Sequence, residues 1–475
     1  MSVTDWQQGA SLELDIHDLS NRGDGVGRWG DRVVFVPNSV PGDRLLIRLV
    51  HIKPSYGHGK ILQILTPSPN RVRPTCIVAD KCGGCQWQPV AYEQQLIAKQ
   101  NEVVQALERI GHLPNPPVNE VIAADPLGYR NKATYPFGRS PTTGQVQAGY
   151  YQKGSHKLVN LNQCPVQDER LNPLLEEVKH DIQTQGWSIY SEKRHQGRLR
   201  HMALRIGRRT GEMLLTLVAT EADWEGLEEE VTDWFNRYPL LVGILLNHNP
   251  NETNSIFGAE TRCIVGRPYL IEQFANLTFH IGATTFFQVN TEQAERLLTV
   301  ILEELALTGN EVLIDAYCGV GTLTLPLAEH VKEAIAIETH DPSVEQAQTN
   351  AAINGINNIM FHVGSVEEVL PVLLEEMANP VDVAVLDPPR KGCTPRVLEA
   401  LLALRPSRIV YVSCNPATLA RDLKALCSDG VYQLTRVQPV DLFPQTSHIE
   451  CVAFLSASSS WNDVQYHPMI HPSVR

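Results

Sequence analysis

The chain has 475 residues, 43% of them apolar, so it is too long for one hydrophobic core and apolar enough to fold into about two to four domains. Its formal net charge of −13 argues against a protein that coats nucleic acid nonspecifically. No apolar run of about 18 residues or more occurs. The N-terminal segment MSVTDWQQGA has neither the charged nor the apolar part of a signal peptide, so we expect a cytoplasmic protein without a membrane segment.

Residues 11–66 contain short runs of alternating apolar residues separated by glycine-rich turns, beginning with LELDI and ending with GKILQIL. This pattern predicts a small β-barrel of the oligonucleotide-binding type over residues 8–67, a fold that holds single-stranded nucleic acid. Residues 44–73 include six Lys or Arg and no Asp or Glu. That basic run favours RNA as the partner, although an ordinary solvated surface has the same composition.

Residues 75–281 are expected to form a central α+β region. A cysteine cluster opens it and is followed by an amphipathic helix over residues 91–110, which Gly111 ends. Strands with β-branched and aromatic alternation dominate the rest, with one further helix over residues 165–182. A second basic run covers residues 193–209.

The ten cysteines are too scattered to form a disulfide framework, so we expect ligands, nucleophiles or core residues. Cys76, Cys82 and Cys85 lie close together around two flexible glycines, and Cys164, which precedes a proline, is the nearest candidate for a fourth ligand. Four thiolates suit either a structural zinc ion or a [4Fe–4S] cluster. The residues themselves leave both alternatives open.

From residue 290 onward, apolar strands and helices alternate, which predicts a doubly wound parallel sheet in a domain of residues 282–456. Ligands of such sheets bind at the carboxyl ends of the strands. The glycine-containing turn after Asp315, the carboxylate of Glu338 and the segment Asp387-Pro388-Pro389-Arg390 all follow strands in this way. The serine-rich tail, residues 457–475, is expected to be disordered.

Cys414 follows the strand RIVYVS and precedes a helix, whose N-terminus favours a thiolate. A thiolate added to C6 of a uracil makes C5 nucleophilic enough to accept a methyl group from a sulfonium, and a base must then remove the C5 proton. Glu450, at the start of the next apolar strand, is the preferred base. His448 is the alternative.

The motifs LIDAYCGVGT, VLDPPRKG, YVSCNP and TSHIE, in this order, closely resemble those of the RNA uracil-C5 methyltransferases, in particular the branch that acts on 23S ribosomal RNA. The resemblance covers nearly the whole chain. It implies a class I, Rossmann-like domain dependent on S-adenosylmethionine and an N-terminal TRAM barrel that binds RNA. It also implies a [4Fe–4S] cluster instead of zinc.

The same resemblance assigns the site residues. It implies Cys414 as the nucleophile and Glu450 as the base. The residues that it implies for S-adenosylmethionine are Gln288, Tyr317, Glu338 and Asp387, and those for the cluster are Cys76, Cys82, Cys85 and Cys164.

A uracil stacked in a helix is inaccessible to a thiolate and a methyl donor together, so the target base must flip out. Arg130, Lys132 and Phe286 are candidate RNA contacts for this step, although surface charges and a core aromatic are an equal explanation. The alternatives in the same class are a transfer RNA uridine-C5 or an RNA cytosine-C5 methyltransferase. Outside it are an iron–sulfur redox protein and a noncatalytic RNA-binding module. We expect a monomer.

Overall fold

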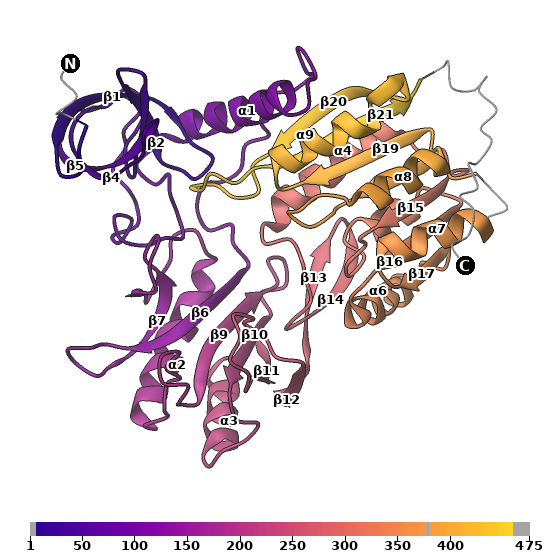
Figure 1. Cartoon of the computed structure of the whole chain (residues 1–475). Coiled ribbons are helices and arrows are strands. Elements are labelled where there is room, and N and C mark those ends of the chain that lie inside the picture. Colours follow the sequence, from indigo (N-terminus) through magenta and orange to yellow (C-terminus); the bar gives the residue numbers. More distant parts are fainter. Residues whose placement is uncertain (1–5, 377–379, 459–475) are drawn as a thin grey trace, which may run out of the picture.

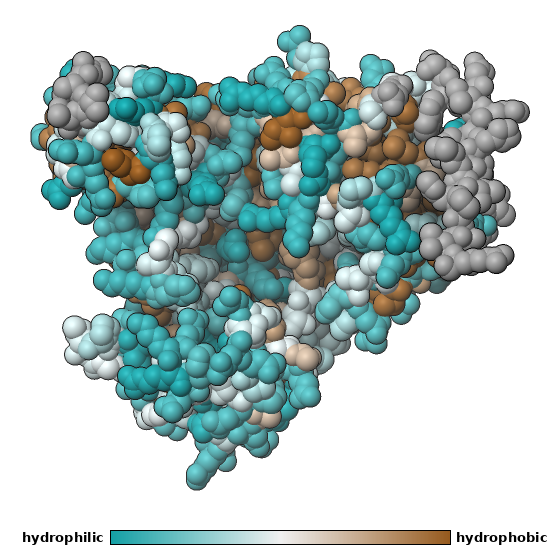
Figure 2. All heavy atoms as spheres, viewed as in Figure 1, coloured by the Kyte–Doolittle hydropathy of each residue, from teal (hydrophilic) through white to brown (hydrophobic). Residues whose placement is uncertain are grey.

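The computed structural model describes residues 6–376 and 380–458. Three parts follow one another along the chain: a barrel, a central sheet with two helices, and a large sheet covered by helices (Figure 1). The face of the molecule in Figure 2 is hollowed where these parts meet. From residue 459 on, the predicted tail lies outside the described residues.

The N-terminal part is a closed barrel with the strand order β1-β2-β3-β5-β4, which confirms the predicted barrel. Alternate residues of β1, among them Leu14 and Ile16, point into its core. Gly27 lies so close to β1 that a Cβ atom there would approach the carbonyl oxygen of Asp15 to 2.6 Å. The strands are β1 (Ser11–Leu19), β2 (Gly25–Trp29), β3 (Arg32–Val36), β4 (Arg44–Ile52) and β5 (Tyr56–Thr66).

The central part is a seven-stranded sheet of order β12-β11-β10-β9-β6-β7-β8. One of its faces packs on α2 and α3 to form an apolar core. The strands are β6 (Lys132–Arg139), β7 (Val146–Tyr151), β8 (Leu158–Asn160), β9 (Leu199–Ile206), β10 (Met213–Ala219), β11 (Leu241–His248) and β12 (Glu260–Gly266). The helices are α2 (Asn172–Thr184), preceded by the 3-10 turn η2 (Glu169–Leu171), and α3 (Leu227–Arg237).

A hairpin of β13 (Tyr269–Phe274) and β14 (Leu277–Gly282) leads to the third part. This part is a seven-stranded sheet of order β17-β16-β15-β18-β19-β21-β20. Its strands are β15 (Val312–Ala316), β16 (Glu333–Glu338), β17 (Ile359–Val363), β18 (Val383–Leu386), β19 (Arg408–Ser413), β20 (Tyr432–Val440) and β21 (Glu450–Ala457). Its helices are α4 (Thr291–Leu305), α5 (Thr324–Ala328), α6 (Asp341–Ile353), α7 (Val366–Glu376), α8 (Pro395–Leu404) and α9 (Pro416–Leu426), with the 3-10 turn η3 (Ser428–Gly430).

The strands β15 to β19 are parallel, as predicted, but β21 runs antiparallel to both of its neighbours, β19 and β20. The prediction of an all-parallel sheet was therefore wrong at this edge. The reversal has a direct consequence for the site, because the first residue of β21 lies beside the last residues of β19.

Helix α1 (Tyr92–Arg109) follows the cysteine cluster in sequence but packs on α9 and β20 of the third part (Figure 1). Its residues Val103 and Leu107 belong to the core on one face of the large sheet. In the described part of the chain, no helix is long and apolar enough to cross a membrane.

Candidate active site

Three predicted cofactor residues lie at one edge of the large sheet because they end neighbouring parallel strands. Tyr317 follows β15, Glu338 ends β16 and Asp387 follows β18. The carboxylate of Glu338 accepts the backbone N–H of Gly319 at 3.1 Å and that of His340 at 2.8 Å. It therefore fixes the turn after β15 while it stays partly exposed.

The turn after β15 is built for close approach to its backbone. Tyr317, Gly319 and Gly321 all have positive φ, with +85° at Tyr317. A Cβ atom at Gly319 would meet nothing within 4 Å, so a ligand can lie against this residue. The hydroxyl of Tyr317 lies 4.0 Å from the Sγ of Cys393, which orients its half-buried ring toward α8.

Gln288, the fourth predicted cofactor residue, lies in the loop between β14 and α4. The loop before α4 is tied to the central sheet, because Asn131 donates from Nδ2 to the carbonyl oxygen of Gln288 at 2.9 Å. Asn290 caps α4 and also donates to the carbonyl oxygen of Leu442 at 3.3 Å. Phe286, in the same loop, is 61% exposed and not a core aromatic, unlike its buried neighbour Phe287.

Two carboxyl groups, one buried and one partly buried, lie at this sheet edge. Asp315 is 1% exposed; its Oδ2 accepts the hydroxyl of Thr324 at 2.5 Å, and its Oδ1 has no partner among the described residues. Burial, with a smaller contribution from Glu338, raises the pKa of Asp315 to about 7. Burial and the proximity of Asp315 raise the pKa of Asp387 to about 7 as well. This acidic pair suits a ligand that carries positive charge.

The raised pKa of Asp315 predicts a pH-dependent stability. Its pKa of about 7 exceeds the ordinary value of 3.8, so the folded state binds the proton more tightly than the unfolded state. The associated stability is complete below about pH 4 and is lost as the pH rises through about 7. Asp315→Asn should therefore raise the free energy of unfolding at about pH 8 by roughly 1–3 kcal/mol and raise the thermal midpoint with it. At about pH 4 it should change both quantities little.

Thermal melts of the ligand-free protein at the two pH values check this expectation. Asp31→Asn is the matched control because Asp31 is exposed in a barrel turn. An Asp315→Asn protein that is destabilised equally at both pH values would contradict the raised pKa.

Cys414 and Glu450 are neighbours because β19 and β21 are antiparallel. The register pairs Ser413 with Cys451. Cys414, which follows Ser413, therefore lies beside Glu450, which precedes Cys451. Their charges interact: burial first, and then Glu450, raise the pKa of the Cys414 thiol. Glu450 is 4% exposed, and burial together with Asp387 raises its pKa well above its ordinary value.

Arg390 is the cation of this site, and its role was not predicted although it stands in the quoted motif DPPRKG. Its guanidinium hydrogen-bonds Cys414 and lowers the pKa of that thiol, against the effects of burial and Glu450. Its Nη2 also lies 3.1 Å from Nδ1 of His448. The backbone of Arg390 is held by Asn415, which caps α9 and donates to the Arg390 carbonyl oxygen at 3.0 Å.

His448 is placed as a partner of Arg390. Burial and the charge of Arg390 lower the pKa of His448 to about 4, so the imidazole is neutral near neutral pH. Cys414, Arg390 and His448 share a cavity of about 160 Å³. Glu102 of α1 also lines this cavity, and burial raises its pKa to about 7. A carboxylate from a helix more than 300 residues away in sequence carried no sequence signal.

Comparison with known proteins shows the family of this chain. The family model of the tRNA (uracil-5-)-methyltransferases matches residues 260–458, and that of the TRAM domain matches residues 5–62. A protein of Nostoc sp. named as an RNA methyltransferase is 61% identical over 464 residues, which cover 98% of this chain and 100% of the relative. The chain belongs to the RNA uracil-C5 methyltransferase family. It is an RNA methyltransferase that uses S-adenosylmethionine.

Other relatives extend the similarity. An RNA methyltransferase of Bacillus cereus is 39% identical over 446 residues, or 94% of this chain and 96% of the relative. The solved tRNA (uracil-54, C5)-methyltransferase of Pyrococcus abyssi, in complex with S-adenosyl-L-homocysteine, is 28% identical. It superposes with a TM-score of 0.74, covering 94% of this chain and 100% of that chain.

The four predicted cluster cysteines of this methyltransferase line one cavity of about 350 Å³. The cysteine loop reaches it by pairing with the end of β7, where Gly83 donates to the carbonyl oxygen of Tyr151 at 2.9 Å. Burial, followed by the nearby Cys164, raises the pKa of the Cys85 thiol to about 12. Arg130 also lines this cavity, and its Nε donates to the carbonyl oxygen of Lys132 at 2.9 Å.

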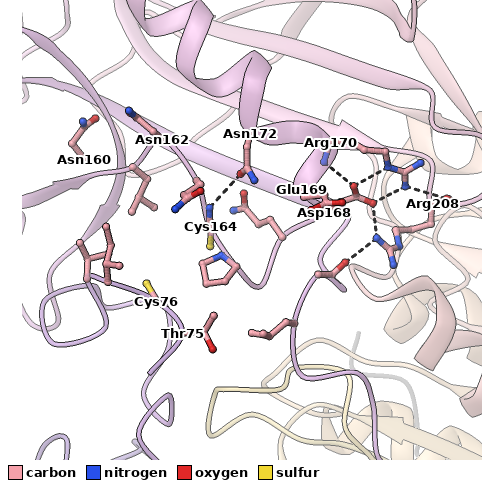
Figure 3. A pocket seen from close by; sticks show the side chains of 18 residues that line it. Thr75, Cys76, Asn160, Asn162, Cys164, Asp168, Glu169, Arg170, Asn172 and Arg208 are labelled. Atoms are coloured by element: carbon pink, nitrogen blue, oxygen red, sulfur yellow. Dashed lines mark hydrogen bonds and ion pairs between the residues drawn. The ribbon is translucent and has the colours of Figure 1, made fainter. Parts of the chain in front are cut away.

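The cysteine cavity has two neighbours. On one side Arg390 and His448 form part of its wall, so it adjoins the cavity that Cys414 lines. On the other, Cys76 and Cys164 also line a larger pocket of about 980 Å³ (Figure 3). Arg170 and Arg208 both pair with Asp168 at its far end.

Helix α1 holds the loop that precedes β21. Lys99 donates to Oδ1 of Asp441 at 2.6 Å, and both side chains are fully buried. Gln95 and Gln445 exchange two hydrogen bonds of 3.1 and 3.0 Å. This loop carries His448 and leads into Glu450, so α1 sets the position of the proposed base.

Proposed function

We propose that this methyltransferase forms a covalent bond between the sulfur of Cys414 and C6 of a uridine, and that Glu450 removes the C5 proton after methyl transfer. The observation that carries the proposal is the antiparallel register of β19 and β21, which sets the two side chains side by side. Arg390 hydrogen-bonds the thiol of Cys414 and favours the ionised form of that thiol.

The chemistry needs both groups. C5 of uracil is too weak a nucleophile to attack a sulfonium, but addition of a thiolate at C6 places electron density on C5. The C5 carbon then takes the methyl group, and C5 holds both a methyl group and a proton. Transfer of that proton to the Glu450 carboxylate lets the C6–S bond break and returns the thiolate of Cys414.

S-adenosylmethionine supplies the methyl group as a sulfonium cation. The residues present fit it, because Glu338 keeps free lone pairs for ribose hydroxyls and the backbone at Gly319 is open to a ligand. The carboxyl groups of Asp315, which is buried, and of Asp387, which is partly buried, favour a cation. We assign Gln288, Tyr317, Glu338 and Asp387 to this ligand.

For the RNA we propose a uridine of 23S ribosomal RNA, on the resemblance of the motifs and the cysteine quartet. The solved relative from Pyrococcus abyssi is named for a transfer RNA uridine, so transfer RNA is the alternative. Incubation with undermethylated RNA of both kinds, followed by nucleoside mass spectrometry, tests the proposal. We expect 5-methyluridine in the ribosomal fraction; 5-methyluridine in transfer RNA alone would change the substrate, and 5-methylcytidine would reject the uracil assignment.

We further propose that Cys76, Cys82, Cys85 and Cys164 hold a [4Fe–4S] cluster. The four cysteines line one cavity of about 350 Å³, which has room for a cluster. The backbone N–H of Gly84 points at the Sγ of Cys82 at 3.4 Å, a contact typical of cluster sulfurs.

Removal of one of these thiols should release the iron. We expect Cys164→Ser, purified without oxygen, to lose most of its iron and the visible absorption of the cluster. Cys263→Ser is the control, since Cys263 lies on β12 and does not line this cavity. Retention of bound zinc, and no iron, in the wild-type protein would favour the structural zinc alternative.

A further inference from the structure

Two cations lie side by side on the face of the central sheet that is turned away from α2 and α3. Lys132 of β6 and Arg205 of β9 are paired across the two antiparallel strands, so their side chains project from the same face. The opposite face, with Ala133 and Leu204, is the one packed on α2 and α3. The two cations therefore face away from the core of this part.

Neither cation has an acidic partner among the described residues. Arg205 is 5% exposed and donates from Nη2 to the carbonyl oxygen of Thr285 at 2.7 Å, while its Nε and Nη1 have no partner. The Nζ of Lys132 lies 5.7 Å from the ring centre of Phe257. Burial, followed by the charges of Arg205 and Arg130, lowers the pKa of Lys132 to about 7, so an anion beside it would favour its charged form. Buried donors without an acceptor are costly, so the site lacks an anion.

The position of this pair connects it to the active site. Asn131, the residue before Lys132, donates to Gln288 and to the hydroxyl of Thr291, and Arg205 donates to Thr285. Both strands are thus attached to the loop that carries the exposed Phe286 and Gln288. An anion held by Lys132 would lie next to the proposed methyl-donor and base-flipping residues.

We propose that Lys132, backed by Arg205, binds a phosphodiester group of the RNA beside the flipped uridine. The proposal rests on the proposed function and adds the contact that fixes the backbone while the base leaves the stack. The ligand chemistry is an oxyanion, and the carboxylate of the methyl donor is the other possible source. RNA is favoured because a phosphate flanks every nucleotide and Phe286, in the adjoining loop, is free to stack on a base.

The test measures binding without turnover, in full-length protein carrying Cys414→Ala. The probe is a synthetic stem–loop RNA with one loop uridine, titrated at several salt concentrations, and S-adenosylhomocysteine is titrated in parallel. Lys132→Met should weaken RNA binding about tenfold or more and reduce the slope of log K against log salt by roughly 0.7–0.9. Lys132→Arg should retain most of the affinity, and Lys157→Met, an exposed lysine before β8, should change it little.

A neutral methylphosphonate placed at single linkages of the same RNA locates the contact. One linkage near the uridine should weaken binding to the parent protein and leave binding to Lys132→Met unchanged. The proposal is overturned if Lys132→Met binds the RNA with the parent's affinity and salt slope, or if it weakens only S-adenosylhomocysteine. Because the test measures binding and not methylation, its result does not depend on whether the covalent mechanism is correct.

Discussion

Replacing Cys414 with alanine should reduce methylation of the RNA by about 10⁴-fold or more, because no other route makes C5 nucleophilic. Binding of S-adenosylhomocysteine should be unchanged, because the residues that we assign to the cofactor lie at the ends of other strands than the one that Cys414 follows. Transfer of labelled methyl groups from S-adenosylmethionine to RNA measures the loss. Cys427→Ala is the matched control, because Cys427 caps the far end of α9.

Covalent trapping separates a nucleophile from a merely structural cysteine. With 5-fluorouridine in the RNA, the fluorine on C5 blocks the final elimination, so the bond between Cys414 and C6 should accumulate together with the transferred methyl group. Denaturing electrophoresis and peptide mass spectrometry locate the linked residue. Rapid methylation by the wild-type protein without any linked species would reject the covalent mechanism.

The second large effect is expected for Glu450→Gln. An amide does not accept the C5 proton, so turnover should fall by about 10²–10⁴-fold, while addition and methyl transfer continue. The variant should therefore hold ordinary, unfluorinated RNA as a covalent and already methylated adduct. This distinguishes a lost base from a misfolded protein, which would form no adduct.

His448→Gln provides the comparison. Its imidazole accepts a hydrogen bond from Arg390 and is neutral near neutral pH, so we expect slower formation of the adduct and no accumulation. If His448→Gln accumulated the adduct and Glu450→Gln released its product normally, the histidine would be the base.

The parallel strand ends of the large sheet could be predicted because they follow a local rule. Glu338 ends an apolar strand, Tyr317, Asp387 and Cys414 each follow one, and neighbouring parallel strands end at one edge. Glu450 required more, since it starts a strand. Only the antiparallel direction of β21, which alternation of strands and helices did not indicate, brings it to the same edge.

Contacts between segments that are distant in the chain could not be predicted from the sequence. Lys99 and Glu102 lie one turn apart on a helix whose sequence pattern is ordinary and amphipathic. Nothing in that pattern indicates that Glu102 lines the cavity of Cys414 or that Lys99 pairs with Asp441. The same holds for Arg205, whose register opposite Lys132 is set by strand pairing. Arg130 is a similar case, because no local signal indicates that it lines the cysteine cavity.

The ion pair between α1 and the loop before β21 means that the catalytic sheet is not a portable module. A fragment beginning at residue 282 would keep every strand of the sheet but would lose Lys99, the buried cation that pairs with Asp441. It would also expose to solvent the apolar surface of the large sheet and its helices that Val103 and Leu107 cover. Fusions or truncations of this enzyme should therefore retain residues 87–110 as a second, separate piece of the same structural unit.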